Sequence, residues 1–508
     1  MLHPDSILGT GGDASGEPLL AVDEIQGNVL PGFGAKFMTF VGLKIVPGGE
    51  DAARRWLREL APCVTTLRQM TGVREVRRAV ARATGVRPQM PDLLLNVVLA
   101  HSALAALGLD AGGVEPIFTR GMREANFHDP EDVEWQLGDT PEKSPDVLLI
   151  VGSDVETIVT DFVALLPGRL AGLRAVYVEP GALLGGDIEH FGFRDGISQP
   201  GVRGRLSERP DHVLTRRYFD SGDPRATTYA RPGQPLVWPG QFLFGYPVQV
   251  EDDPEMPGLV AEPPAPWMRN GSYMVYRRLN QNVTAFRRFA GEHAPAISQK
   301  LGRAVSAEEL QALIVGRWPD GTPLVRSPER PDPAMADDDD AINFFSYADE
   351  ERDAQIVVDG TSVTIPGAPG DDAASRCPHF AHIRKVNLRD KGTDKGSPLL
   401  FRLLRRGIPF GPPFTEGEAD GIDRGLLFVS YQRNLELQFM THVETWMNAP
   451  DAPEGFGHDL LVGQSATPRF GDLHNGERLL DAPAATTWIV PTGGGFFFSP
   501  AVSVLREL

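Results

Sequence analysis

A carboxylate between two glycines is the first residue whose type and setting could do chemistry. Asp195 lies in the run HFGFRDGISQP, close to Gly192 and next to Gly196. Flexible glycines allow a carboxylate to be held at a cavity wall, where burial raises a carboxyl pKa and suits the group to proton transfer. An ordinary Asp–Gly turn would have the same sequence. Taken alone, the segment favours the turn.

Two histidines close to a cysteine form a second candidate. The run CPHFAHIRK contains Cys377, His379 and His382. Histidines three residues apart can share a helix face, and Cys377 would complete a three-ligand zinc site. Alternatively, one histidine binds a metal axially and leaves the opposite position open for a small ligand. The third interpretation is a capped helix with one surface and one core histidine. No fourth zinc ligand lies nearby, which weakens the zinc interpretation.

Two further segments combine apolar strands with a possible site residue. Arg405 lies in LLRRGIPFG, where a guanidinium at the end of an apolar strand can face an anion or a polarised oxygen. A simple ion pair with a surface carboxylate is the alternative. The run GLLFVSY at 425–431 contains Leu426 and Phe428. It suits the wall of an apolar cofactor pocket, and by itself it suits a core strand better.

Composition excludes several classes of protein. The chain has 508 residues, of which 41% are hydrophobic and 23% charged, so it can bury packed cores. Its formal charge of -19 disfavours general nucleic-acid binding. The sequence has no P-loop, dinucleotide fingerprint, HExxH or GxSxG motif, and no apolar run long enough to span a membrane. Residues 1–27 lack the pattern of a signal peptide, so we expect a cytoplasmic protein, with secretion after removal of a leader as the alternative.

The elements that must position these residues follow a repeated pattern. In the first half, β-type runs at 37–45, 93–99, 146–151 and 173–179 alternate with helical spacing at 51–67, 102–107 and 155–166. The order β-α-β-β-α-β predicts a ferredoxin-like α+β unit. The second half repeats it, with strands at 241–246, 272–276, 425–431 and 496–498, helices at 283–293 and 435–447, and a turn after 399–404.

This pattern predicts three parts of the chain. We expect a flexible tail at 1–23, an N-terminal domain at 24–215 that carries GFRDG, and a C-terminal domain at 216–508. An acidic, loop-rich insertion is expected at about 321–375. Its four consecutive aspartates, 337–340, lack the spacing and closing Glu of a calcium loop, which favours a solvated acidic loop.

Together, and in this order, these segments resemble the dye-decolourising peroxidases, a family of haem enzymes. The matching runs are FGFRDGISQP (191–200), AHIRKVN (381–387), LLRRGIPFGP (403–412), GLLFVSYQ (425–432) and GGGFFFSP (493–500). The resemblance spans residues 24–505 and is to the longer members of the family. The sequence departs from the family at Leu388, where Pro is usual, and at His379, where Ala often stands.

The resemblance implies a fold, a cofactor and its ligand. The fold would be two tandem ferredoxin-like domains with antiparallel sheets, of which the second binds haem b. His382 would be the iron ligand. Glu436, in the run QRNLELQF, would accept the hydrogen bond of the other imidazole nitrogen and increase electron donation to the iron.

The resemblance also implies the activity. Asp195 would move a proton between the oxygens of hydrogen peroxide, and Arg405 would stabilise the charge on the departing oxygen. A ferryl–porphyrin radical would then oxidise dyes, phenols and other bulky aromatic substrates. Leu426 and Phe428 would limit access to the iron.

Bulky substrates would therefore give up electrons at the protein surface, and Tyr431 and Trp446 are the first candidates for carrying them. Two other functions remain open: a haem-handling protein that releases iron or porphyrin, and a non-catalytic ferredoxin-like binding module. No nucleic-acid or membrane partner is expected, and the physiological reductant and oligomeric state are left open.

Overall fold

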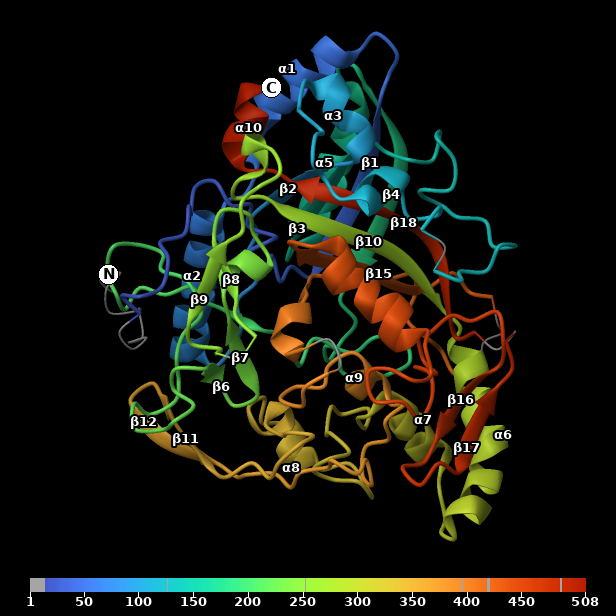
Figure 1. Cartoon of the computed structure of the whole chain (residues 1–508). Helices are drawn as coiled ribbons and strands as arrows, with labels where there is room; N and C mark the ends of the chain where they lie inside the picture. The colour runs from blue at the N-terminus through green and yellow to red at the C-terminus, as the bar shows by residue number, and fades with distance from the viewer. Residues whose placement is uncertain (1–13, 126, 252, 394–395, 418–420, 485–486) are drawn as a thin grey trace.

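In the computed structural model, four strands from the first half of the chain pair antiparallel in the order β2-β3-β1-β4 (Figure 1). The structure describes all residues except 1–13, 126, 252, 394–395, 418–420 and 485–486. The strands are β1 (Phe37–Ile45), β2 (Leu94–Leu99), β3 (Val147–Ser153) and β4 (Leu173–Ala182). All four fall where β-type runs are predicted. The α+β class with antiparallel sheets is thus confirmed.

The helices of this half are α1 (Glu50–Leu60), α2 (Leu67–Thr84), α3 (His101–Leu107), α4 (Pro116–Arg120) and α5 (Glu156–Leu165). The single helix predicted at 51–67 is wrong after residue 60, where α1 ends and a turn leads to α2. Pro62 lies in a 3-10 turn, η2 (Ala61–Cys63), after which Thr66 and Gln69 form a reciprocal cap that begins α2. Helix α2 ends at Gly85, whose φ of 71° is the left-handed conformation that glycine adopts without strain.

The second half forms a sheet of the same kind. Its strands are β10 (Ser272–Gln281), β13 (Leu404–Arg405), β14 (Ile408–Phe410), β15 (Gly425–Gln432) and β18 (Ile489–Ser499). Strand β10 pairs with both β18 and β15, and β15 pairs with β13 and β14. The principal helices are α6 (Val283–Leu301), α7 (Ala307–Val315) and a π-helix, η8 (Leu435–Met447). If β13 and β14 are counted as one interrupted strand, each half has four strands. In both halves the fourth strand then pairs with the first, and the third pairs with the second.

The two sheets join at their edges. Phe498 of β18 pairs with Leu99 of β2, and Phe410 of β14 pairs with Gly181 of β4. Because β10 also pairs with β15, the order β10-β18-β2-β3-β1-β4-β14-β15 closes on itself. The two halves therefore share one continuous hydrogen-bonded ring.

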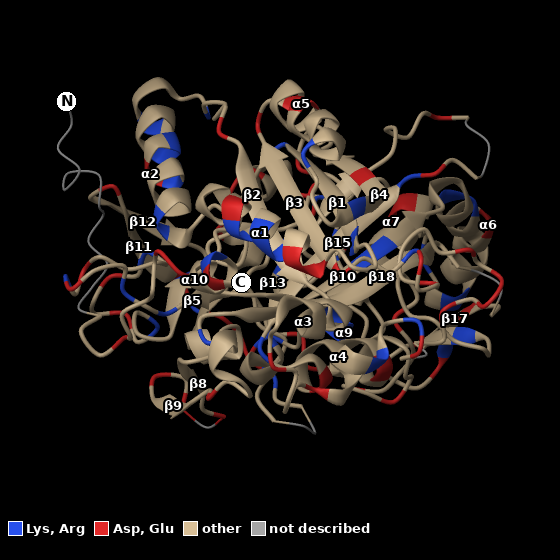
Figure 2. Cartoon of the chain, turned by 90° about the horizontal axis from the view of Figure 1, so that it is seen from above, with Lys and Arg blue, Asp and Glu red and all other residues tan. Residues whose placement is uncertain are grey.

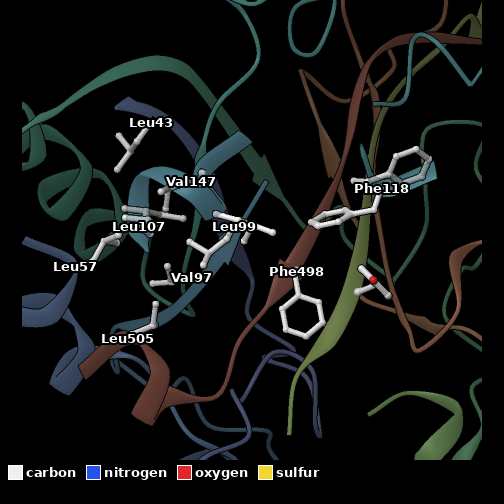
Figure 3. Close-up of a cluster of buried hydrophobic side chains, with 14 of the residues drawn as sticks. Leu43, Leu57, Val97, Leu99, Leu107, Phe118, Val147, Phe498 and Leu505 are labelled. Atoms are coloured by element: carbon white, nitrogen blue, oxygen red, sulfur yellow. The ribbon is translucent and has the colours of Figure 1, made fainter. Parts of the chain in front are cut away.

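Apolar side chains from both halves fill the core on either side of this ring. Figure 3 shows Leu99, Val147 and Phe498 in one such cluster, to which Leu57 and Leu505 also belong. Residues from β2, β3 and β18 thus pack together although they lie far apart in the sequence. This packing stabilises the junction of β18 and β2, where the two sheets meet through the pair Phe498–Leu99.

The remaining elements lie between the strands of the two sheets or, for α10, after the last strand. They are η3 (Leu166–Gly168), β5 (Gly201–Val202), β6 (Tyr229–Arg231), β7 (Gln234–Val237), η4 (Pro239–Gln241), β8 (Pro247–Gln249), β9 (Pro257–Val260), η5 (Pro266–Met268), α8 (Pro333–Ala336), η6 (Ala341–Asn343), β11 (Ala354–Val358), β12 (Thr361–Ile365), α9 (His382–Lys385), η7 (Pro398–Phe401), β16 (Arg469–Asp472), β17 (Arg478–Ala482) and α10 (Val502–Glu507). The strand predicted at 241–246 is wrong. Pro239 begins η4, and Gly245 has a φ of 90°, so the chain turns there.

The predicted loose tail is also wrong for the part that the structure describes. Residues 1–13 lie outside the described residues, but Leu20 and Val22 are buried. The carboxylate of Glu17 is buried against Arg203 and Arg217 and accepts the backbone N–H of Gly204 at 2.7 Å. A paired, buried carboxylate anchors this segment to residues 203–217.

Charged residues of both signs are mixed along most elements in the view of Figure 2, with basic residues along α2. No helix in the described part of the chain is both long enough and apolar enough to cross a membrane.

Candidate active site

One cavity of about 300 Å³ brings together residues from distant parts of the sequence. The predicted site residues that line it are Asp195, His382, Arg405, Leu426 and Phe428. Its walls are mostly apolar; the segment 189–200 lines one part, and β10, β15, α9 and η8 contribute to the rest. A cavity with apolar walls and a few converging polar groups is the usual form of a cofactor or ligand site.

His382, the first residue of α9, is held by a buried carboxylate. Its Nδ1 atom lies 2.6 Å from Oδ2 of Asp459. The other oxygen of Asp459 accepts the N–H groups of Leu461 (3.0 Å) and Val462 (3.1 Å). Burial raises the pKa of Asp459, but the charge and hydrogen bond of His382 outweigh burial, so the pKa lies below its usual value. The ionised carboxylate can only accept, so Nδ1 carries a proton; when the ring is neutral, Nε2 therefore keeps the lone pair that can bind a metal.

The prediction that Glu436 contacts this imidazole is wrong. Glu436 lies in the first turn of η8, where its side chain is exposed and its backbone N–H donates to Glu115. The face of η8 that lines the cavity carries Phe439, His442 and Val443 instead. Asp459, on the loop after η8, has the role expected of Glu436.

Asp195 and Arg405 meet at the cavity wall. Nη1 of Arg405 lies 3.6 Å from Oδ1 of Asp195, and Nη2 donates to the carbonyl of Ser198 at 2.8 Å. The backbone N–H of Gly196 donates to the same Asp195 oxygen at 2.6 Å. Arg405 stands opposite Ser430 in the β13–β15 pairing, so the sheet fixes its backbone. A carboxylate and a guanidinium thus lie side by side at the cavity wall.

Strand alternation explains the position of Leu426 and Phe428. Both are partly exposed to the cavity, whereas Leu427 and Val429 between and beyond them are buried in the core. Strand β15 thus forms the cavity wall with one face and packs into the core with the other. The pocket-wall interpretation describes one face of the strand, and the core interpretation describes the other.

A second cavity, of about 470 Å³, adjoins the first and shares Glu189, Asp195 and Leu426 with it. Its wall includes part of the four-aspartate run, which is not merely a solvated loop. Asp339 pairs with Arg194 at 2.6 Å, and the buried Asp340 pairs with Arg231 at 2.8 Å. The predicted insertion is therefore bound to the segment that carries Asp195.

Several arginines besides Arg405 also line the first cavity, among them Arg317, Arg389 and Arg402. Burial and the charge of Arg389 lower the pKa of Arg317 to about 9 and that of Arg402 to about 10. The Nε–H group of Arg402 is buried without an acceptor among the described residues. Such a cluster of like charges favours an anionic group bound beside it.

The zinc interpretation of Cys377, His379 and His382 finds no support. Nδ1 of His379 lies 3.2 Å from Glu454, and its ring stacks on Phe456. Burial raises the pKa of the Cys377 thiol to about 12, which disfavours the thiolate that zinc binds. Within the described residues, no three His, Cys, Asp or Glu side chains are grouped as metal ligands.

Tyr431 and Trp446 are both buried rather than exposed at the surface. The Tyr431 hydroxyl donates to Asn96 at 2.8 Å and accepts from Asn28 at 3.1 Å. Trp446 packs against Phe401 and His442. Neither side chain lines the first cavity.

Comparison with known proteins finds one group of similar proteins. The family model for the C-terminal part of Dyp-type peroxidases matches residues 248–456. The dye-decolorizing peroxidase msp1 of Mycetinis scorodonius is 28% identical to this chain and covers 97% of it, with 89% of that protein matched. The multifunctional dye peroxidase DyP2 of an Amycolatopsis species is 29% identical, with 97% of each chain covered. A solved ancestral D-type dye-decolorizing peroxidase superposes with a TM-score of 0.73, at 28% identity, over 96% of this chain and 99% of that one. The chain is similar to dye-decolourising peroxidases over nearly its whole length.

This similarity implies a haem cofactor, and the residues of the first cavity fit one. The imidazole of His382 has Nδ1 engaged by Asp459, so Nε2 is left for iron. Apolar walls suit a porphyrin ring. The Nε–H of Arg402, which has no acceptor among the described residues, and the nearby charge of Arg389 suit the carboxylates of a haem.

Sequence reasoning missed two groups of residues. Asp459 lies 77 residues after His382, and no spacing rule connects them. Its only signal is an aspartate in an apolar run, HDLLVG. Arg389 and Arg402 lie next to predicted site segments in the sequence. Sequence position alone does not distinguish such an arginine from one that is exposed at the surface.

Proposed function

We propose that this chain is a haem b peroxidase that reduces hydrogen peroxide and oxidises dyes, phenols and other bulky aromatic substrates. The observation that carries the proposal is that one cavity is lined both by His382 and by the Asp195–Arg405 pair. A metal ligand, a proton-transfer group and a fixed cation are the protein groups that peroxide cleavage requires. A related dye-decolorizing peroxidase has been solved in complex with 2,6-dimethoxyphenol, which supports phenols as a substrate class.

His382 would hold the iron through Nε2, and Arg317, Arg389 and Arg402 would face the haem carboxylates. When bound, haem supplies the redox chemistry that accepts two electrons from reducing substrates. Asp459 keeps the imidazole in one orientation and one tautomer, and its negative charge increases the electron donation of Nε2.

Asp195 would accept a proton from one oxygen of hydrogen peroxide and return it to the other, which leaves as water. Arg405, 3.6 Å from that carboxylate, would stabilise negative charge on the departing oxygen. Leu426 and Phe428 would keep bulky aromatic molecules away from the reacting atoms while peroxide enters.

We further propose that the two halves are tandem ferredoxin-like domains, at 24–215 and 216–508, and that the second holds the haem. The same strand order in both halves supports this division. Most cavity residues that would face the cofactor belong to the second half, whereas Asp195 comes from the first.

An optical spectrum of the protein expressed with a haem precursor tests the proposed function. We expect an intense Soret band that shifts on addition of hydrogen peroxide, together with catalytic oxidation of a dye. A haem-free protein at full expression, or stoichiometric zinc in place of iron, would contradict the proposal.

A further inference from the structure

The segment that carries Asp195 is a tight hairpin. The N–H of Glu189 donates to the carbonyl of Phe193 at 2.9 Å, and the N–H of Gly192 donates to the carbonyl of Glu189 at 2.9 Å. At its open end, the N–H of Asp195 donates to the carbonyl of Asp187 at 3.0 Å. Asp195 therefore stands where the hairpin ends, and its position depends on the geometry of the turn.

The carboxylate of Glu189 satisfies the inside of this turn. Its Oε2 accepts the backbone N–H of Phe191 at 2.9 Å, and its Oε1 accepts that of Phe193 at 2.9 Å. Oε2 also accepts a hydrogen bond from Nε2 of Gln281, the last residue of β10. One carboxylate thus closes the turn and ties it to the sheet of the second half.

Glu189 also lies close to the proposed chemistry. It lines both cavities, as does Asp195. Burial raises the pKa of Glu189 to about 7, with a further contribution from the charge of Asp195. The arginines of the surrounding elements are directed elsewhere: Arg194 to Asp339, Arg277 to Asp129 and Arg405 to Asp195. Amide donors, not a cation, therefore stabilise this carboxylate.

We propose that Glu189 is the positioning residue for Asp195, holding the hairpin so that the Asp195 carboxylate stays beside Arg405 at the cavity wall. The inference rests on the proposed function, in which Asp195 moves the peroxide proton. Glu189 touches neither peroxide nor cofactor in this scheme; it acts through Asp195.

The substitution Glu189→Gln probes this role with little change of shape. The amide offers one acceptor oxygen and an NH₂ group that cannot accept, so either Phe191 or Phe193 is left with an unpaired buried N–H. The turn should then loosen. Because a displacement of about 1 Å can lower a rate by about 100-fold, we expect the peroxide reaction to slow by about tenfold.

A double-mutant cycle separates positioning from general damage. We would measure the rate at which peroxide changes the haem spectrum in Glu189→Gln, in Asp195→Asn and in the double variant. The tenfold loss should disappear in the Asp195→Asn background. Amide hydrogen exchange of the protein, with and without haem, should be faster in Glu189→Gln at residues 188–196 and unchanged elsewhere.

Glu115→Gln is the matched control. Burial raises the pKa of Glu115, and its carboxylate accepts the N–H groups of Leu435 and Glu436, but it lines neither cavity. Any loss it causes should be the same in both Asp195 backgrounds. If Glu189→Gln does not fold, Gln281→Met removes only one donor and should give a smaller loss with the same dependence on Asp195.

Three outcomes would overturn the proposal. An unchanged peroxide rate in Glu189→Gln would exclude a role for this carboxylate. An equal fractional loss in both Asp195 backgrounds would show that Glu189 does not act through Asp195. If Asp195→Asn itself reacts at the full rate, the proposed role of Asp195 fails, and the positioning role fails with it.

Discussion

The Nδ1 atom of His382 and the Oδ2 atom of Asp459 lie 2.6 Å apart, and the carboxylate is fully buried. Two backbone N–H groups hold the other oxygen of Asp459, so the carboxylate cannot turn away from the imidazole. This arrangement fixes which ring nitrogen remains free, and it gives the proposed iron ligand a strongly donating partner.

Replacing Asp459 with Asn should weaken that donation. The amide keeps the shape but removes the negative charge, so we expect the peroxide reaction to slow by about 10- to 100-fold and the reduction potential of the iron to rise. Stopped-flow spectra and a redox titration measure both. Glu436→Gln, at an exposed position, is the control and should change neither quantity.

Removing either member of the Asp195–Arg405 pair should slow peroxide cleavage more than substrate oxidation. Asp195→Asn removes the proton-transfer group, with an expected loss of about 100- to 10,000-fold. Arg405→Leu removes the fixed charge, with an expected loss of about 100- to 1,000-fold. Stopped-flow mixing with peroxide isolates this step. Full rates in both variants would exclude these residues from it.

Tyr431 and Trp446 should behave as packing residues. Because the Tyr431 hydroxyl is buried between Asn28 and Asn96, Tyr431→Phe should lower the free energy of unfolding by about 1 kcal/mol. Tyr431→Phe and Trp446→Phe should each reduce turnover of a bulky dye and a small phenol by the same factor. A selective loss on the bulky dye would instead identify an electron-transfer residue.

Glu454 should make stability depend on pH. Burial raises its pKa, but hydrogen bonds from His379, Arg384 and Lys391 outweigh burial and hold the pKa well below its usual range. A carboxyl whose pKa is lower in the folded state stabilises the fold above its unfolded pKa, and this stabilisation is lost as pH falls toward the folded pKa.

Glu454→Gln should therefore lower the free energy of unfolding by about 3 kcal/mol at neutral pH, because it breaks a buried ion pair. The difference from the native protein should narrow below about pH 4, where an unfolded Glu is protonated. Urea unfolding of both proteins at several pH values measures this difference in the free energy of unfolding. The exposed Glu59→Gln serves as the control and should show no such trend. A constant difference at all pH values would contradict the assignment.

Local pattern was enough to predict most strands of the nine-stranded sheet, because most of them carry a run of apolar or β-branched residues between turn signals. Strand β1 begins and ends where the pattern at 37–45 places it. The pattern was insufficient at 241–246, where an apolar run folds into a turn because Pro239 and Gly245 set the backbone. Closure of the two sheets into one ring depends on edge contacts such as Phe410–Gly181, which no local signal encodes.

The candidate site shows the same limit. Asp195, His382 and Arg405 could be chosen because each lies in a distinctive run, and the fold brings them to one cavity. Glu436 was predicted from the resemblance of the run QRNLELQF to the family's pattern, and nothing in the sequence pointed to Asp459. Which carboxylate reaches the imidazole is decided by the path of the loop after η8, a tertiary property that the sequence does not reveal.

The optical spectrum of the haem-loaded protein, compared between His382→Ala and His379→Ala, tests the central claim most directly. We predict that His379→Ala keeps the spectrum of a five-coordinate histidine-ligated haem and that His382→Ala loses it. Retention of that spectrum in His382→Ala, with its loss in His379→Ala, would contradict the assignment of His382 as the iron ligand.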